Sequence, residues 1–542
     1  MAAERRALLG TSLACLAIAF AAVLPLFGFD GWPNSHEGLS IFERAEGFRR
    51  AFAAGDFLPL WTPFCHRGHG SPWPFFYHRL FTTVSGGMGW MLGSTYRGVR
   101  LALVALLFVG ATGAAAAARR LGASSPVQVL AAFLLCSSPY TFFDWLVRGA
   151  AAEFSAMMLY PWLLWACLRL LTHGRGGSAA GFVFTLLFYA HTVMFLYALP
   201  TFAIALGFVL ARWGWRPTLV AAGQAALPVL VLCAPYALLL VRLGRSFNTD
   251  ALGVFTPDRE FVPLGHYLWD SEFRWGLQWM GVTPELGPAL LGGLLLLAAG
   301  VVTSRVGWPR GRRSALLFLS LTAALYAVLQ VPVSAPFYRA VPFASLIQFP
   351  WRLVGLLTSL LVLMWSVLVE EALRRGGWRR GLALAVGVLP VCAGLVLGWK
   401  ATHPRYEAWS RTFIEEHLAR LDRPWSANEY LPRLVLGVGI APPMPFLSHQ
   451  GCDRVAAEPA RALGESVHFG RITLSISSAR GCAVSFNQYQ TPFLATEASG
   501  PVRFATTQAG TLLIQVPPGE HRVELRQRGL LELLVRELWP AH

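Results

Sequence analysis

Charged residues are scarce in this chain of 542 residues. Asp, Glu, Lys and Arg together make up 14% of it, and its mean hydropathy is +0.49. A typical soluble domain has about 25% charged residues, so an ordinary soluble enzyme is excluded. The apolar content of 55% excludes a disordered chain. The sequence therefore predicts a protein that crosses a membrane many times.

The short motifs of common cofactor sites are also missing. The chain has no phosphate-binding P-loop, no dinucleotide-binding glycine motif and no Cys/His spacing typical of zinc sites. Most of its eight Cys fall in apolar runs and are read as packing residues. Cys452 and Cys482 are expected to form a disulfide in an oxidising compartment, the alternative being two buried thiols.

Apolar runs long enough to span a bilayer recur from the N-terminus to residue 400. Eleven spans are predicted: 7–27, 99–118, 125–143, 153–171, 178–190, 192–211, 218–241, 286–304, 314–331, 349–369 and 381–399. The fifth, 178–190, is short, and it is interpreted either as a span or as part of a broken pair with the sixth, 192–211.

The distribution of arginine predicts the orientation. With the N-terminus in the cytoplasm, the inner segments hold 16 Arg and only three acidic residues, whereas basic and acidic residues nearly cancel outside. This is the positive-inside pattern, and it accounts for the basic isoelectric point without nucleic-acid binding. A multi-pass membrane protein is expected, with its N-terminus inside and its C-terminal region outside the cytoplasm.

Three outer segments are long, namely 28–98, 242–285 and 401–542. We expect residues 1–400 to form a transmembrane domain whose first outer loop, 28–98, carries function. Apolar residues at helical spacing predict an amphipathic helix over 41–54 on the outer membrane surface. Aromatic, Pro and Gly residues follow it up to Tyr77, which is a candidate for stacking on a substrate.

The last outer segment is expected to form a periplasmic domain over 401–542. A helix is predicted near 405–421, and runs of period-two alternation predict antiparallel strands packed as a small β-sandwich. The sandwich is interpreted as a lid or packing module, with sugar binding as the alternative. The predicted strands cover 471–477, 483–486, 511–516 and 521–525.

Ionisable groups at the outer ends of spans are costly to bury and often functional. Acids, arginines and a histidine converge there on one face of the membrane, although an arginine at a helix end can simply snorkel to lipid phosphates. The candidate site residues are Glu37, Asp144, Arg148, Glu153, His191, Gln348 and Arg352.

These residue types suit transfer from a lipid-linked phosphate. A carboxylate can act as general base toward a hydroxyl, and arginine binds phosphate with two parallel hydrogen bonds. A site at the membrane surface would meet a substrate whose phosphate lies in the headgroup layer. The pattern therefore favours a lipid-phosphate-linked sugar as substrate.

The motifs of this face, taken together, resemble a family of bacterial polytopic membrane proteins labelled "6-pyruvoyl-tetrahydropterin synthase-related". Nothing in the chain resembles a pterin enzyme, and in layout the family is similar to the GT-C glycosyltransferases. The resemblance covers roughly residues 10–435. Its motifs are His36-Glu37, Gly55-Asp56-Phe-Leu-Pro-Leu-Trp61, Gly68-His-Gly-Ser-Pro72, Phe76-Tyr77, Arg148-Gly-Ala-Ala-Ala-Glu153, Gln348-Phe-Pro-Trp-Arg352 and Glu429-Tyr-Leu-Pro432.

This resemblance implies a GT-C fold and a polyprenyl-phosphate sugar as donor. It implies that Glu37 is the catalytic base, with His36 beside it at the substrate. A divalent metal, Mg²⁺ or Mn²⁺, is a further candidate, with Glu37, Asp144 and Glu153 as its ligands. The alternatives are a lipid or glycan transporter (a flippase) and a non-catalytic assembly protein with a degenerate GT-C fold.

Overall fold

The computed structural model describes residues 2–249 except 29, 34 and 36, and 310–375 except 342, 343, 345 and 346. It also describes 408–419, 430–436, 440, 442–463 and 468–539, with scattered residues in 257–295 and 377–392. The chain divides into two compact units. Unit 1 is Met1–Gly38, Arg100–Cys233 and Phe255–Arg411; unit 2 is Leu39–Val99, Ala234–Val254 and Thr412–His542.

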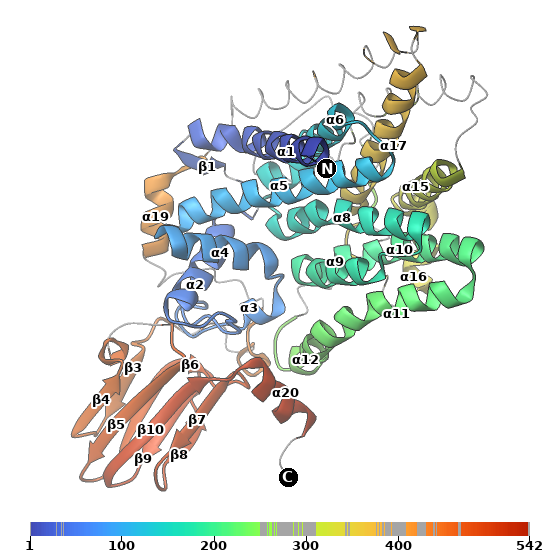
Figure 1. Cartoon of the computed structure of the whole chain (residues 1–542). Coiled ribbons are helices and arrows are strands. Elements are labelled where there is room, and N and C mark those ends of the chain that lie inside the picture. Colours follow the sequence, from blue (N-terminus) through green and yellow to red (C-terminus); the bar gives the residue numbers. More distant parts are fainter. Residues whose placement is uncertain are drawn as a thin grey trace. The chain divides into compact units, whose positions relative to one another are not determined.

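Unit 1 is a bundle of apolar helices (Figure 1). A two-stranded sheet joins β1 (Gly31–Pro33) to β2 (Ala408–Ser410), with Trp32 paired to Trp409. The helices are α1 (Ala2–Gly28), α5 (Thr95–Arg120), α6 (Ser125–Cys136), α7 (Pro139–Phe142), η1 (Phe143–Arg148), α8 (Ala151–His173), α9 (Gly177–Ala190), α10 (Thr192–Trp213), α11 (Trp215–Leu232), α15 (Arg310–Leu329), η5 (Pro332–Ser334), α16 (Ala335–Ala340), η7 (Pro350–Arg352) and α17 (Leu353–Arg375).

Small residues allow the helices of this bundle to approach closely. α9 packs against α11, where a side chain at Gly177 or Gly181 would meet the backbone oxygen of Ala221 or Ala225. Spacing small residues four apart is a common way to pack helices in a membrane, where apolar burial gives no driving force between helices. α8 and α17 are buried along most of their length and form the centre of the bundle.

Most of the predicted spans that fall on described residues are helices at the predicted places. Within the described residues, seven helices are long and apolar enough to cross a membrane, or eight if a bent pair counts as one span. The protein is thus a multi-pass α-helical membrane protein. The predicted spans 286–304 and 381–399 lie almost entirely outside the described residues, so the count of eleven stays a prediction.

Two predicted spans are broken, and a proline lies just after each break. The span predicted at 125–143 is α6 followed by α7 and η1, bent by 45° before Pro139. The span predicted at 218–241 ends at Leu232, and a second helix, α12 (Ala234–Gly244), begins before Pro235. Proline lacks an amide hydrogen and clashes with the preceding turn, so a continuous helix is unfavourable at both places.

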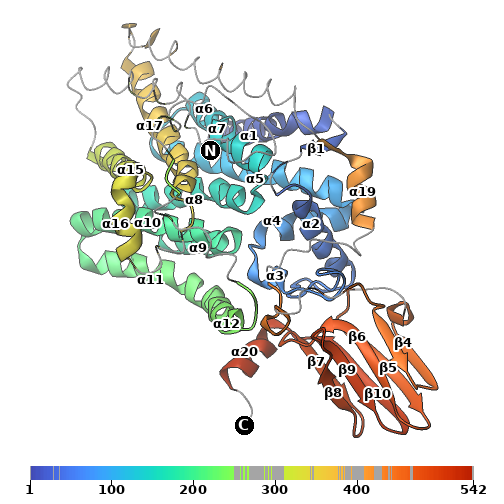
Figure 2. The ribbon, with the colours of Figure 1, turned by 180° about the vertical axis from the view of Figure 1, so that it is seen from behind.

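Unit 2 combines short helices with a β-sandwich (Figures 1 and 2). The apolar face predicted for 41–54 is buried in α2, but so is Glu46, which accepts hydrogen bonds from Arg49, Arg50 and Thr95. Protein therefore encloses this helix, and its predicted place on the membrane surface is corrected. The helices are α2 (Gly38–Ala53), α3 (Trp73–Phe76), α4 (Leu80–Leu92), α12, α19 (Arg411–Ala419), η8 (Arg433–Val435), η9 (Ala460–Leu463) and α20 (Leu530–Leu538).

The β-sandwich confirms the fold class predicted for the C-terminal region. Its sheets are antiparallel, in the orders β4-β5-β10-β7 and β3-β6-β9-β8. Alternate residues of β5 point into the shared core, as period-two patterning requires. The strands are β3 (Leu447–Gln450), β4 (Arg454–Glu458), β5 (Arg471–Ser478), β6 (Cys482–Tyr489), β7 (Leu494–Ala498), β8 (Arg503–Thr506), β9 (Thr511–Val516) and β10 (Gly519–Gln527).

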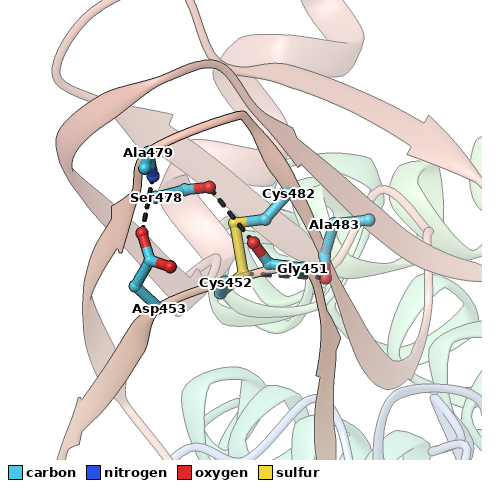
Figure 3. The surroundings of a disulfide bond; sticks show 7 residues. All are labelled: Gly451, Cys452, Asp453, Ser478, Ala479, Cys482 and Ala483. Carbon is cyan, nitrogen blue, oxygen red and sulfur yellow. Dashed lines mark hydrogen bonds between the residues drawn. A yellow bond between two sulfur atoms is a disulfide. The ribbon is translucent and has the colours of Figure 1, made fainter.

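Cys452 and Cys482 form a disulfide at one edge of the sandwich (Figure 3). Cys452 lies where the chain passes from β3 in one sheet to β4 in the other, and Cys482 begins β6. The bond therefore fastens the crossing between the sheets to a central strand. Asp453 next to it accepts a hydrogen bond from the amide of Ala479 at 2.6 Å.

The unit boundary differs from the division expected at residue 400. Residues of the first long loop group with the sandwich and not with the helix bundle. Trp61 Nε1 donates to Gln488 Oε1 at 2.9 Å, and the amide of Tyr489 donates to the carbonyl oxygen of His69 at 2.9 Å. The end of β6 thus holds the loop through buried polar contacts that the sequence pattern does not reveal.

Candidate functional site

The candidate site begins with a wide helical turn between α7 and α8. Asp144 and Arg148 lie in η1, a π-helix, and Arg148 Nη1 donates to Asp144 Oδ1 at 2.7 Å. Gly149 ends the turn with φ of +69°, a left-handed conformation that glycine adopts without strain. The chain then enters α8, whose first turn carries Glu153. π-Helical turns are rare and occur frequently at functional sites.

Glu153 is the centre of a network of buried hydrogen bonds and ion pairs. Its Oε1 accepts from the Tyr140 hydroxyl at 2.6 Å, and its Oε2 accepts from Arg148 Nη1 at 2.9 Å. Arg352 Nε lies 3.0 Å from the same Oε2. We call Asp144, Arg148, Glu153 and Arg352 the arginine–carboxylate cluster.

Aromatic rings surround the two guanidinium groups. Arg352 comes from η7, which follows the Gln348-Phe349 segment and leads into α17. The Arg148 guanidinium lies 4.6 Å from the centre of the Trp351 ring, and that of Arg352 lies 4.7 Å from the Phe349 ring. Tyr197 on α10 donates to the carbonyl oxygen of Phe349 at 3.0 Å and so fixes this turn.

The cluster is balanced in charge and is held almost entirely inside unit 1. The carboxylates of Asp144 and Glu153 are 0% and 1% exposed, whereas each arginine side chain keeps 11%. An unpaired charge at such a place would cost several kcal/mol. Within the described residues, Arg148 uses only Nη1 and Arg352 only Nε for these contacts.

Glu37 is joined to this cluster through its backbone. Its amide donates to the carbonyl oxygen of Arg148 at 3.0 Å. Glu37 is half-buried, in the turn just before α2. The structure thus brings together Glu37, Asp144, Arg148 and Glu153, and Arg352 joins them from about 200 residues further along the chain. His36 lies outside the described residues.

The other candidates have different surroundings. His191 separates α9 from α10, where its Nδ1 accepts from the amide of Met194 at 3.3 Å and caps α10. Gln348 lies four residues before Arg352 and is half-buried. Tyr77 belongs to unit 2, where the Arg44 guanidinium lies 3.8 Å from the centre of its ring.

Tyr140 and Tyr197 are contributors that the sequence analysis did not single out. Each hydroxyl lies in an apolar helix and donates to a group of the cluster or of the turn that carries it. A hydroxyl within a span must find a partner because hydrocarbon offers none. The tyrosines of the predicted spans were therefore a usable signal, but only the fold shows what each one meets.

The cluster does not fit a divalent metal ion. Mg²⁺ and Mn²⁺ prefer several oxygen ligands, and a guanidinium next to those oxygens repels a cation. Both oxygens of Glu153 are already engaged, and Arg148 occupies Asp144 Oδ1. Across the described parts of the chain, no three His, Cys, Asp or Glu side chains come together as metal ligands do.

No protein-family model matches the chain, and no curated protein matches it in sequence. Among solved structures, it is similar to the archaeal oligosaccharyltransferase AglB of Archaeoglobus fulgidus, in complex with an inhibitory peptide and a dolichol-phosphate. Identity is 13% and the TM-score 0.44, over 79% of this chain and 61% of that one. This chain therefore spans less than two thirds of the archaeal protein's length.

Two further solved proteins show likeness at a comparable level. ArnT from Cupriavidus metallidurans, bound to undecaprenyl phosphate, shares 14% identity with a TM-score of 0.44, over 73% of this chain and 77% of that chain. The arabinofuranosyltransferase AftD from Mycobacteria shares 16% with a TM-score of 0.45, over 74% and 27%. These are similarities in the course of the chain alone.

Proposed function

We propose that this protein is a membrane glycosyltransferase. It transfers a sugar from a polyprenyl-phosphate donor to an acceptor outside the cytoplasm, in a cell-envelope glycan, a lipid or a protein. The observation that carries the proposal is the arginine–carboxylate cluster, in which Glu153 holds the guanidinium groups of Arg148 and Arg352, together with the main-chain hydrogen bond from Glu37 to Arg148.

The two arginines have the chemistry for a lipid-linked phosphate. Buried carboxylates fix one edge of each guanidinium, so little side-chain freedom is lost when a phosphate binds the remaining N–H groups. The aromatic rings around them keep water out, which strengthens an ion contact. Arg148 and Arg352 would then stabilise the negative charge that grows on the departing phosphate.

In the proposed reaction, Glu37 acts as general base. Its carboxylate takes the proton of the acceptor hydroxyl while that oxygen attacks the anomeric carbon of the sugar. A bond forms from the acceptor oxygen to this carbon, and the bond from the carbon to the phosphate oxygen breaks. The polyprenyl phosphate leaves with the bonding electrons, and the anomeric configuration inverts.

Two other functions were considered from the sequence, a flippase and a non-catalytic assembly protein. A flippase would be expected to carry charges along its spans, whereas in the described part of the chain the four charges of the arginine–carboxylate cluster lie at one place and cancel. The neutrality of the cluster favours the assembly protein, because a network of balanced charges can serve stability alone. Substitution of Glu37 distinguishes an assembly protein from a transferase, since only the assembly protein would keep its function.

The proposed place is a bacterial inner membrane, with the N-terminus in the cytoplasm and the sandwich in the periplasm. A reporter fused after residue 310 should be active only as a cytoplasmic marker, and one fused after residue 430 only as a periplasmic marker. A cytoplasmic reading at 430 would contradict this orientation, because residue 430 and the first outer loop are expected on one side.

The decisive experiment replaces Glu37 by Gln. Transfer is measured in membranes that contain a pool of polyprenyl-phosphate sugars, with detection of the glycosylated product. Gln keeps the size but cannot take a proton, so the rate should fall by about 10²–10⁴. Asp30→Asn is the matched control, since it removes an exposed carboxylate from the same segment. Near-normal transfer by Glu37→Gln would reject the base assignment and direct the search to Asp144 and Glu153.

A further inference from the structure

The last helix of the chain, α20, presents an apolar face to its surroundings. Leu531, Val535, Leu538 and Trp539 are 78%, 61%, 40% and 75% exposed. The spacing of four and three residues places Leu531, Val535 and Leu538 along one side of the helix, and Trp539 directly follows its last turn. A soluble domain rarely exposes four large apolar side chains in one stripe, so this face is expected to have a partner.

The orientation of α20 is fixed by contacts on its other sides. Leu533 is fully buried in unit 2. Glu532 accepts from Arg526 Nη1 at 2.5 Å, and Arg536 Nη1 donates to the carbonyl oxygen of Pro492 at 3.2 Å. The helix is thus docked on the sandwich by its polar edge, and the outward direction of its apolar face is a property of the fold.

α20 packs against α12, and the two helices lie side by side in both ribbon views (Figures 1 and 2). α12 is itself apolar and exposes Leu238 and Val241. A single residue, Cys233, joins α12 to α11, which is long and apolar enough to cross a membrane. By chain connectivity alone, α12 begins where this span ends.

We propose that the apolar face of α20 lies in the headgroup layer of the lipid bilayer. A helix that packs on the continuation of a span is within reach of that layer. Leu531, Val535 and Leu538 would enter the boundary between headgroups and acyl chains, with Trp539 as an interfacial anchor. The exposed residues Arg242, Arg245 and Arg536 supply positive charge for lipid phosphates.

The consequence is a second attachment of the sandwich to the membrane, besides the covalent path of the chain. It would restrict how the sandwich, and the first outer loop that it holds, can rotate above the bilayer. This inference concerns lipid contact and is independent of the proposed transferase activity.

The test measures the depth of a spin label in the full chain. A background without Cys65 and Cys392 leaves only buried thiols and the disulfide, so that single cysteines can be labelled. Val535→Cys reports on the apolar face, and Arg522→Cys, exposed on β10, is the matched control. The protein is placed in nanodiscs of phosphatidylethanolamine and phosphatidylglycerol, and collisions with oxygen and with a water-soluble nickel chelate are compared.

The expected result is a higher ratio of oxygen to nickel collisions at position 535 than at position 522. The double variant Leu531→Glu, Val535→Glu, with the label at Leu538→Cys, should lose that preference. Equal ratios at 535 and 522 would overturn the proposal. So would protection of position 535 from both reagents together with spin–spin broadening, which would identify a second copy of the chain as the partner.

Discussion

The backbone amide of Glu37 donates a hydrogen bond to the carbonyl oxygen of Arg148 at 3.0 Å. The residue proposed as base is therefore tied to the turn whose side chain is proposed to hold the donor phosphate. The contact uses only main-chain atoms, so substitution of the Glu37 side chain should leave it in place. This separation makes the chemistry of Glu37 testable without disturbing its position.

Gly38→Ala should impair transfer although every charge is retained. Gly38 has φ of +28°, and a β-carbon there would collide with the ring of Trp409, the β2 residue that pairs with Trp32. Relief of that collision must shift Trp409 or the Glu37 segment, at about 1–3 kcal/mol. The temperature of thermal unfolding and the transfer rate should both fall. Gly207→Ala should change neither, because a β-carbon at Gly207 would meet no atom within 4 Å. Wild-type transfer by Gly38→Ala would show that this segment needs no fixed position.

Glu153→Gln should destabilise the protein strongly. It leaves Arg148 and Arg352 with Asp144 as their only described carboxylate partner, so a buried positive charge is uncompensated. Removal of one member of a buried ion pair costs about 3–5 kcal/mol. The measurement is the aggregation temperature in detergent, with the exposed Glu520→Gln as control. Partial rescue by Arg352→Gln in the same chain would identify charge imbalance as the cause.

The contact between α2 and α19 should weaken as the pH rises. His417 Nε2 lies 2.6 Å from Glu43 Oε1, and this hydrogen bond raises the pKa of His417. The folded unit therefore holds the proton more tightly than the unfolded chain, whose His pKa is about 6.5. The stabilisation, about 1 kcal/mol for a partly exposed pair, is complete below that value and is lost as the pH passes the raised pKa.

Hydrogen exchange of residues 411–419, corrected for the intrinsic rate, measures this loss. Wild-type protection should decrease as the pH rises from 6 to 9 and passes the raised pKa of His417, and His417→Gln should remove the dependence. His449→Gln, at an exposed position of β3, should keep it. A wild-type protection that does not change between pH 6 and pH 9 would contradict the role assigned to this pair.

Gln488→Leu should loosen the first long loop. Gln488 is 1% exposed; it accepts from Trp61 and donates to the carbonyl oxygens of Pro63 and Gly68. Leu would leave these groups buried without partners, at about 1–3 kcal/mol each. Protease cleavage within 61–71 should increase, whereas the exposed β9 variant Gln515→Leu should behave as wild type. Unchanged cleavage would show that the sandwich does not hold the loop.

Local patterns in the sequence were sufficient for the helices and strands. Hydropathy placed α1, α5, α8, α10, α15 and α17, and alternation placed β5, β6, β9 and β10, because burial of one face imposes a period on each element. Hydropathy missed the breaks at Pro139 and Pro235, since an apolar run does not show whether the helix axis bends within it. It also missed the enclosure of α2, because apolar residues pack equally well on lipid and on protein.

For the site, the sequence by itself determined that Asp144, Arg148 and Glu153 lie near one another, since all three belong to one segment of ten residues that turns at Gly149. Only the tertiary structure decided that Arg352, about 200 residues later, completes this group and that His191 caps a helix instead. It also decided that Tyr77 belongs to the other unit. The reason is physical: buried charges choose partners by distance after the helices have packed, and spacing along the chain carries no information about that distance.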